Sequence, residues 1–195
     1  MNVREIIELK KRVLSCNKCS LRTTCKSPVF GRGSIMPDVL IVGEAPGLEE
    51  DEKSLPFVGR SGSFLQKIID SVELESYAIT NVVRCRPPNN RTPTQQEILS
   101  CRKHLEDQIK IMKPKLILSV GRVASEAILS RKVRILEENA KGILNTSFGI
   151  PTVLCVHPSW AIRNGGRTEE IRKAIEECKM FISKVDATGL ESKVS

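Results

Sequence analysis

The residues best placed to do chemistry follow an apolar run early in the chain. Residues 39–42 read Val-Leu-Ile-Val, and residues 43–47 read Gly-Glu-Ala-Pro-Gly. Four apolar residues in succession predict a buried strand, which the glycines and the proline end. Open α/β sheets bind ligands beyond the carboxyl ends of their strands, so this acidic turn predicts a binding site. Its glycine spacing matches neither a Walker A loop nor a dinucleotide-binding fingerprint.

Four cysteines form two pairs whose thiolates could bind a metal. Cys16 and Cys19 are separated by two residues, and Cys85 and Cys101 by fifteen. Four thiolates could hold a tetrahedral zinc ion or a 4Fe–4S cluster, and this spacing leaves both open. Cys25 is a rival ligand, because it lies close enough in sequence to replace Cys16 or Cys19. The other two cysteines lie in an apolar strand and on an apolar helix face, and we expect both in the core: Cys155 and Cys178.

Apolar runs that alternate with helical patterns predict the scaffold that positions these residues. Thr94 and Glu97 form a capping box that marks the start of one helix. The pattern predicts an α/β fold, a single three-layer α/β/α domain with a central four-stranded, mainly parallel sheet. The expected strands are 39–42, 78–83, 116–121 and 152–156, and the expected helices are 2–12, 62–74, 94–112, 122–130 and 169–185.

Three loops that follow strand ends carry most of the polar candidates, namely residues 43–62, 81–91 and 157–164. Because parallel strands end at the same edge of a sheet, we expect these loops to converge there. Residues 1–185 are expected to form the domain and residues 186–195 a disordered tail. The proline- and glycine-containing segment before the first strand is expected to be a connector.

Composition limits the class of protein and its partners. The chain has 195 residues, a formal net charge of +8 and a sequence pI near 9.2. This length suits one domain, and the positive charge favours a polyanion such as nucleic acid. No apolar run reaches the roughly 18 residues of a membrane span, and the charged amino-terminal segment lacks a signal-peptide core. We therefore expect a cytoplasmic protein with no membrane partner. Its seven cysteines, an odd number, are expected to be metal ligands or core residues rather than a disulfide framework. We also expect a monomer.

Four motifs, taken together, resemble those of the family 4 uracil-DNA glycosylases, the iron–sulfur branch of that superfamily, of thermophile, archaeal and bacterial type. The first motif is GEAPGLEED followed by PFVGRSG, in residues 43–62. The others are the C-x-x-C of residues 16–19, TNVVRCRPPNNR at 80–91 and HPS at 157–159. The resemblance covers about residues 5–185, which is nearly the whole chain.

The resemblance implies a uracil-DNA glycosylase-like fold and a monofunctional enzyme of base excision repair. Such an enzyme flips uracil out of DNA, hydrolyses its N-glycosidic bond and leaves an abasic site. Its implied partner is uracil-containing DNA, single- or double-stranded. The resemblance also assigns a 4Fe–4S cluster, whose expected role is to hold the amino-terminal helix to residues 85–101, and four ligands for it: Cys16, Cys19, Cys85 and Cys101.

The same resemblance assigns four residues to uracil binding. Phe57 would stack on the flipped base, which contributes about 1–3 kcal/mol. The Asn81 amide has one acceptor and two donors, which match the N3–H and O4 of uracil. Backbone N–H groups of the turn at Ala45 would bind O2. His157 would stabilise the negative charge that develops on O2.

Position 45 is where family 4 departs from the better-known family 1 enzymes, which carry a water-orienting aspartate there. An alanine side chain does no acid or base chemistry, so Glu44 and Glu50 are the candidate catalytic carboxylates. Of the two, Glu50 is ranked first as a pocket residue.

DNA contacts are assigned to the segment that follows the motif histidine, at Ser159, Trp160 and Arg163. Ala161 stands where the superfamily usually has a leucine that fills the gap left by the flipped nucleotide. Because alanine is too small for that role, we expect Trp160 or Ile162 to take it.

Two other functions compete with excision. One is a uracil-DNA binding protein that traps the base without turnover; related trapping proteins carry an inserted basic loop with a nucleophilic histidine. Residues 131–142 include Arg131, Lys132 and Arg134 but no histidine, which argues against this function. The other is a nucleic-acid-associated iron–sulfur protein with electron-transfer duty, which the loop chemistry around Phe57 and Asn81 disfavours.

Overall fold

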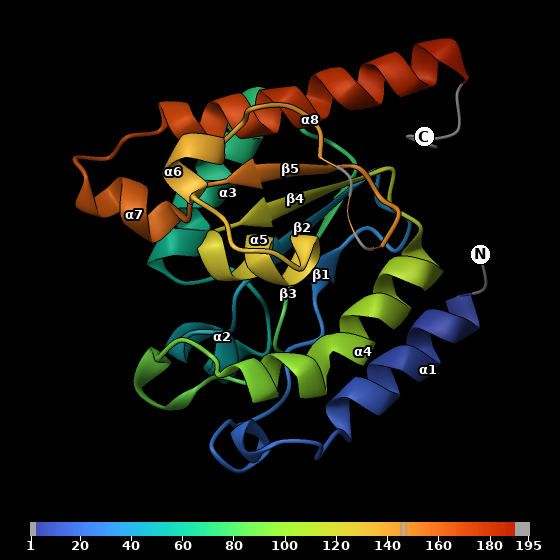
Figure 1. Cartoon of the computed structure of the whole chain (residues 1–195). Coiled ribbons are helices and arrows are strands. Elements are labelled where there is room, and N and C mark those ends of the chain that lie inside the picture. The colour runs from blue at the N-terminus through green and yellow to red at the C-terminus, as the bar shows by residue number, and fades with distance from the viewer. Residues whose placement is uncertain (1–2, 145, 147, 190–195) are drawn as a thin grey trace.

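The computed structural model describes residues 3–144, 146 and 148–189, in which a five-stranded sheet lies between helices (Figure 1). The strand order is β1-β3-β2-β4-β5, and all neighbouring pairs are parallel except β1 with β3. The strands are β1 Arg32–Gly33, β2 Val39–Gly43, β3 Tyr77–Asn81, β4 Leu116–Val120 and β5 Thr152–Cys155.

The predicted α/β fold is confirmed, with one additional strand. The four expected strands are β2 to β5, and each contains residues that are buried almost throughout. The additional strand, β1, pairs Arg32 with Ile79 and lies within the segment expected to be a connector. Two residues that include a glycine carry no strand periodicity, so β1 depends on its pairing with β3 rather than on local sequence.

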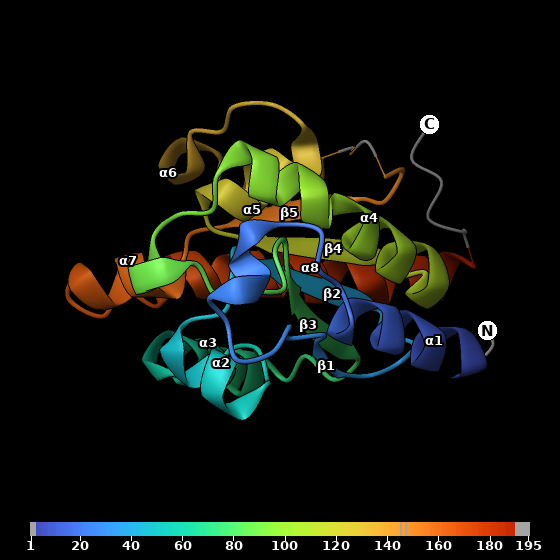
Figure 2. The ribbon, with the colours of Figure 1, turned by 90° about the horizontal axis from the view of Figure 1, so that it is seen from below.

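Two helical layers cover the sheet. Helices α3 and α8 lie on one face, while α1, α4 and α5 lie on the other, as both views show (Figures 1 and 2). The predicted helices are confirmed with small shifts at their ends, and Thr94 caps α4 through the expected capping box. The α-helices are α1 Val3–Leu14, α2 Leu48–Lys53, α3 Arg60–Val72, α4 Gln95–Met112, α5 Arg122–Leu129, α6 Ile135–Glu138, α7 Pro158–Arg163 and α8 Glu169–Thr188.

Short elements and chain ends differ from the expectations. Helices α2, α6 and α7 are one or two turns long, too short to give a helical periodicity in sequence. Two 3-10 helices were likewise not expected, η1 Ser20–Thr23 and η2 Pro88–Asn90. Helix α8 continues to Thr188, so the first residues of the predicted tail are helical. Residues 190–195 and the expected helix start at Asn2 lie outside the described residues.

A separate apolar core fills the space on each side of the sheet. One core joins alternate strand residues to α3 and α8, and the other joins the remaining strand residues to α1, α4 and α5. Burial on both faces is why these parallel strands are continuous apolar runs. Across the residues that the structure describes, no helix is both long enough and apolar enough to cross a membrane.

Candidate active site and cysteine cavity

A pocket of about 590 Å³ opens at the carboxyl edge of the sheet. It lies where β2 is flanked by β3 on one side and β4 on the other, which is the usual ligand position in open α/β sheets. The three loops expected to converge do so. A fourth segment, Gly121 and Arg122 after β4, also lines the pocket and was not expected from the sequence. The signal was available, because Gly121 ends a buried apolar run as Gly43 does.

Phe57 forms part of the pocket wall in a backbone conformation that its neighbours impose. Its φ is +53°, in the left-handed region, and Gly62 packs against its backbone so closely that a Cβ there would lie 2.1 Å from the Phe57 carbonyl carbon. On the other side, a Cβ at Gly43 would lie 2.5 Å from the Phe57 ring. The glycines of the motif therefore make room for this aromatic side chain.

Glu50 holds the Phe57 loop rather than leaving its carboxylate free. Its Oε1 accepts hydrogen bonds from the backbone N–H of Val58 at 2.9 Å and of Gly59 at 2.8 Å, and its Oε2 accepts from Gly47 N at 3.1 Å. Arg32 Nε donates to the Pro56 carbonyl at 3.0 Å from the opposite side. Glu50 lines the pocket, but this geometry favours a positioning role over the catalytic role for which it and Glu44 are the candidates.

Asn81 ends β3 directly beside the last residue of β2, because the sheet register pairs it with Gly43. The side chain is 2% exposed, and its Oδ1 has no hydrogen-bond partner among the described residues. A Cβ at Gly43 would lie 2.5 Å from that oxygen, so the amide lies close to the glycine and the Phe57 ring, although Asn81 is not among the residues that line the pocket. An unpartnered buried acceptor costs free energy unless a ligand donor reaches it.

His157 follows β5 and caps α7, and its tautomer is set by that position. Its Nδ1 accepts the Ser159 backbone N–H at 3.1 Å and lies 2.7 Å from the Ser159 hydroxyl. Burial, assisted by the Arg163 charge, lowers the pKa of His157 to about 4. The ring is therefore neutral at pH 7 and carries its proton on Nε2, as a donor.

Gly121 leaves the space in which the His157 ring lies. Its φ is +89°, and a Cβ at this position would lie 3.2 Å from the Cβ of His157. The Phe57 and His157 rings lie in the same pocket with centroids 6.5 Å apart.

Glu44 is the pocket carboxylate whose environment suits base chemistry. Burial raises its pKa, while a hydrogen bond with Thr92 and the charge of Arg122 oppose that rise. A raised pKa makes a carboxylate a stronger base. Ala45 lies next to it in the pocket wall and presents only a methyl group and its backbone.

The expected DNA-contacting residues separate into two groups. Ser159 and Arg163 line the pocket, whereas Trp160, on the same helix α7, is partly buried against the core. Ala161 is fully buried, so it is unavailable to fill a gap in DNA. Trp160 and Ile162, both partly exposed, remain the candidates on this helix.

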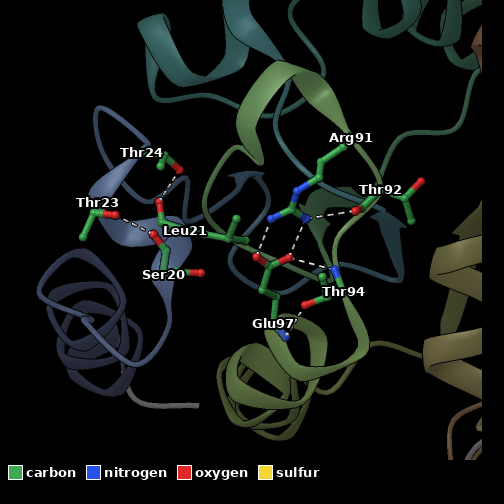
Figure 3. A network of polar contacts seen from close by, with 8 residues as sticks. All are labelled: Ser20, Leu21, Thr23, Thr24, Arg91, Thr92, Thr94 and Glu97. Carbon is green, nitrogen blue, oxygen red and sulfur yellow. Dashed lines mark hydrogen bonds and ion pairs between the residues drawn. The ribbon is translucent and has the colours of Figure 1, made fainter.

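An ion pair holds the pocket wall that follows β3. Arg91 donates through both terminal nitrogens to Glu97, at 2.8 and 2.7 Å, and Glu97 also accepts the backbone N–H of Thr94 (Figure 3). Figure 3 also shows the neighbouring 3-10 helix, whose Leu21 points toward Glu97. Because α4 carries both Glu97 and Cys101, it connects this wall to the cysteines.

Replacing Glu97 by Gln should lower the Tm by about 2–6 °C at neutral pH, since an amide cannot accept both arms of Arg91. Arg91 lowers the pKa of Glu97 from 4.5 to about 2. A depressed pKa stabilises the fold fully above about pH 4.5, and that contribution is lost as pH falls through about 2. Thermal unfolding of both proteins between pH 7 and pH 2 should show the Tm difference narrowing below pH 4.5. An equal difference at all pH values would contradict an ionic role.

Four cysteines line a second, small cavity between the loop after α1, the segment after β3 and helix α4. We call Cys16, Cys19, Cys85 and Cys101 the cavity cysteines. Cys25 does not line this cavity, although its thiol hydrogen-bonds that of Cys85 and, after burial, adds to the rise in the pKa of Cys85. Cys155 and Cys178 are buried in the core on the other side of the sheet, as expected.

Besides the four thiols, two buried nitrogen-bearing side chains line the cavity. Among the residues described, no three Cys, His, Asp or Glu side chains gather tightly enough to hold one metal ion. Four thiols that line one cavity are the kind of donor set that holds a 4Fe–4S cluster. The two nitrogen-bearing side chains are Arg84 and His104, whose Nε and Nε2 atoms are buried and have no hydrogen-bond partner among the residues that the structure describes. The donor set and these two nitrogens fit an anionic, sulfur-rich group.

Several known proteins with similar sequences are uracil-DNA glycosylases. A model of the uracil DNA glycosylase superfamily matches residues 30–179. A type-4 uracil-DNA glycosylase of Thermotoga maritima is 38% identical over 190 residues, which cover 92% of this chain and 96% of that protein. A type-4 enzyme of Pyrobaculum aerophilum is 36% identical over 177 residues, covering 87% and 90%. A type-5 uracil-DNA glycosylase of the same organism is 25% identical over 189 residues, covering 80% and 83%.

Proposed function

This chain belongs to the uracil DNA glycosylase superfamily and, within it, to the type-4 enzymes, and we propose that it excises uracil from DNA in base excision repair. The observation that carries the proposal is the unpartnered Oδ1 of Asn81, buried close to an aromatic side chain that shares its pocket with a neutral histidine. An acceptor, a stacking surface and a donor are what recognition of a flipped uracil requires.

Asn81 supplies the specificity of the proposed site. Its Oδ1 would accept the N3–H of uracil, and its amide would donate to O4. Phe57, locked by the Glu50 and Arg32 hydrogen bonds, would stack on the base. Cytosine presents the reverse pattern at both positions, so its binding would leave buried groups of Asn81 unpaired.

His157 supplies the charge stabilisation. As the glycosidic bond breaks, the electron pair of that bond remains on uracil, and negative charge builds on O2. The Nε2–H of neutral His157, together with backbone N–H groups of the turn at Ala45, would donate to that oxygen. The Ser159 backbone holds the imidazole in the donating tautomer throughout.

Glu44 is the proposed partner of the attacking water. With alanine at position 45, it is the pocket carboxylate whose pKa burial raises, so it would accept a proton from water as C1′ of the sugar is attacked. Glu50 would act by holding Phe57. Ser159 and Arg163 would contact DNA phosphates at the pocket rim.

The cavity cysteines would hold a 4Fe–4S cluster, which is expected of the family. Bound there, it would supply structural cross-linking between the loop after α1 and helix α4. Uracil excision itself needs no electron transfer. The cavity and the pocket share no lining residue, which supports a structural rather than a catalytic role.

Alanine at any one of the four cavity cysteines should lose iron and lower the Tm, because each removes a thiolate ligand and loosens the cross-link. Iron per chain and thermal unfolding measure this. Alanine at Cys155 or Cys178 is the matched control and should keep full iron. Cys25→Ala should also keep its iron. Loss of iron in Cys25→Ala, together with full iron content in Cys19→Ala, would overturn the assignment of the four ligands.

Trp160→Ala should lower excision from duplex DNA more than from single-stranded DNA, because only a duplex needs the gap of the flipped nucleotide filled. The ratio of the two rates, measured for wild type, Trp160→Ala and Ile162→Ala, identifies the residue responsible. Equal losses on both substrates would mean that Trp160 acts only through its packing against the core.

Release of free uracil from a uracil-containing oligonucleotide under multiple turnover tests the function. Catalytic release, with intact product strands bearing abasic sites, is the expected result. Stoichiometric retention of the DNA would support the trapping alternative instead. Action on both single- and double-stranded DNA stays a prediction, which the same assay on the two substrates tests. The monomeric state is a prediction that sedimentation tests, and the cytoplasmic location stays a prediction as well.

A further inference from the structure

Arg84 is a fully buried cation without an anionic partner in the described part of the chain. The side chain is 2% exposed. Its terminal nitrogens donate to the Phe30 carbonyl at 3.0 Å and to Gln108 Oε1 at 2.7 Å, both neutral acceptors. A guanidinium is charged at neutral pH, so Arg84 brings a positive charge into the interior.

A buried charge of this kind needs compensation. Removing a guanidinium from water costs several kcal/mol, and two neutral acceptors return only part of that. The third nitrogen, Nε, is buried and has no acceptor among the described residues. The bonds to Phe30 and Gln108 therefore explain how the side chain is oriented but not why it is an arginine.

Arg84 is one of the residues that line the cysteine cavity, together with Cys85 and Cys101. His104 lines the same cavity from α4, one turn after Cys101. It is 6% exposed, and its Nε2 is likewise buried without a partner.

We propose that Arg84 and His104 are dedicated polar partners of the iron–sulfur cluster. Arg84 balances part of the net negative charge that four thiolates bring to the cluster, and His104 donates its Nε2–H to a cluster sulfur. Charge and hydrogen bonds around the sulfurs set the reduction potential and the retention of such clusters. This inference rests on the proposed cofactor, and it adds two residues that touch neither uracil nor DNA.

The test measures the cluster rather than excision. In Arg84→Gln the amide can still donate to the Phe30 carbonyl, but the charge is lost. Its reduction potential, followed by spectroelectrochemistry, should shift to more negative values, since adding an electron no longer brings it near a cation. Iron release to a chelator should become about 10-fold faster or more. His104→Phe keeps the ring shape and should shift both quantities in the same direction.

Three control variants separate charge from packing. Arg84→Lys keeps the charge and should lie near wild type in potential. Arg86→Gln removes a cation from the same loop, and Gln108→Leu removes the side-chain acceptor of Arg84; neither should shift the potential as Arg84→Gln does.

Unchanged reduction potential and unchanged iron release in both Arg84→Gln and His104→Phe would overturn the inference. The proposed cofactor and function would still stand in that case, because they are tested by the iron content and the uracil release of the wild type. If Arg84→Gln does not fold, His104→Phe decides by the same two measurements. A wild-type chain that binds zinc or no metal would overturn both the cofactor and this inference, whereas excision is judged separately by uracil release.

Discussion

His157→Phe should lower the rate of uracil excision by about 100- to 1,000-fold, the loss typical when one donor to a developing oxyanion is removed. Phenylalanine keeps a flat ring in the space beside Gly121 but has no Nε2–H. Single-turnover rates on a uracil-containing oligonucleotide measure the effect. Binding of the substrate should change little, because the hydrogen bond strengthens only as charge builds on uracil O2.

Two measurements test whether the neutral tautomer is what matters. Ser159→Ala removes the hydroxyl at 2.7 Å from Nδ1 but keeps the backbone N–H that fixes the proton on Nε2, so its loss should be far smaller. Because the pKa of His157 is lowered to about 4, the excision rate should show no limb near pH 6.5 attributable to this residue. A rate that rises as pH falls through 6.5 and depends on His157 would show that the imidazolium is the active form.

The sheet could be predicted because its parallel strands are buried on both faces and therefore consist of apolar runs. The convergence of the loops followed from that topology alone. Strand β1 could not be predicted, since its two residues are defined by pairing with Ile79 and Ala78, far away in sequence. Helix α7 was read as a loop because a six-residue helix has too few turns for an apolar face.

Within the site, residue types could be predicted but not their hydrogen-bond partners. Glu50 is a catalytic candidate from sequence because the alanine at position 45 can do no acid or base chemistry. Its role as the anchor of Val58 and Gly59 depends on how the chain folds back eight and nine residues later. For the same reason, the unpartnered atoms of Asn81 and Arg84 have no signature in sequence. An atom is recognised as unpartnered only after the packing around it is known.

The amide of Asn81 offers the sharpest test of base recognition. The Oδ1 that has no partner within the described chain would accept the N3–H of uracil, while the amide nitrogen donates to O4. Cytosine has a donor at position 4 and an acceptor at N3. Each mismatched buried group costs about 1–3 kcal/mol, so two mismatches would exclude cytosine from the site.

Asn81→Asp should lose most uracil excision and gain weak cytosine release, because this change reverses the donor–acceptor pattern at nearly constant volume. A carboxylate accepts from the cytosine amino group. Burial close to Gly43 and Phe57 raises the pKa of a carboxyl group, and its protonated form donates to N3. Cytosine release should therefore be strongest at mildly acid pH, measured on matched uracil and cytosine oligonucleotides. Asn81→Ala is the control and should lose uracil excision without gaining cytosine release. Uracil excision within a few-fold of wild type in both variants would show that Asn81 is only a turn residue, and that another group reads the base.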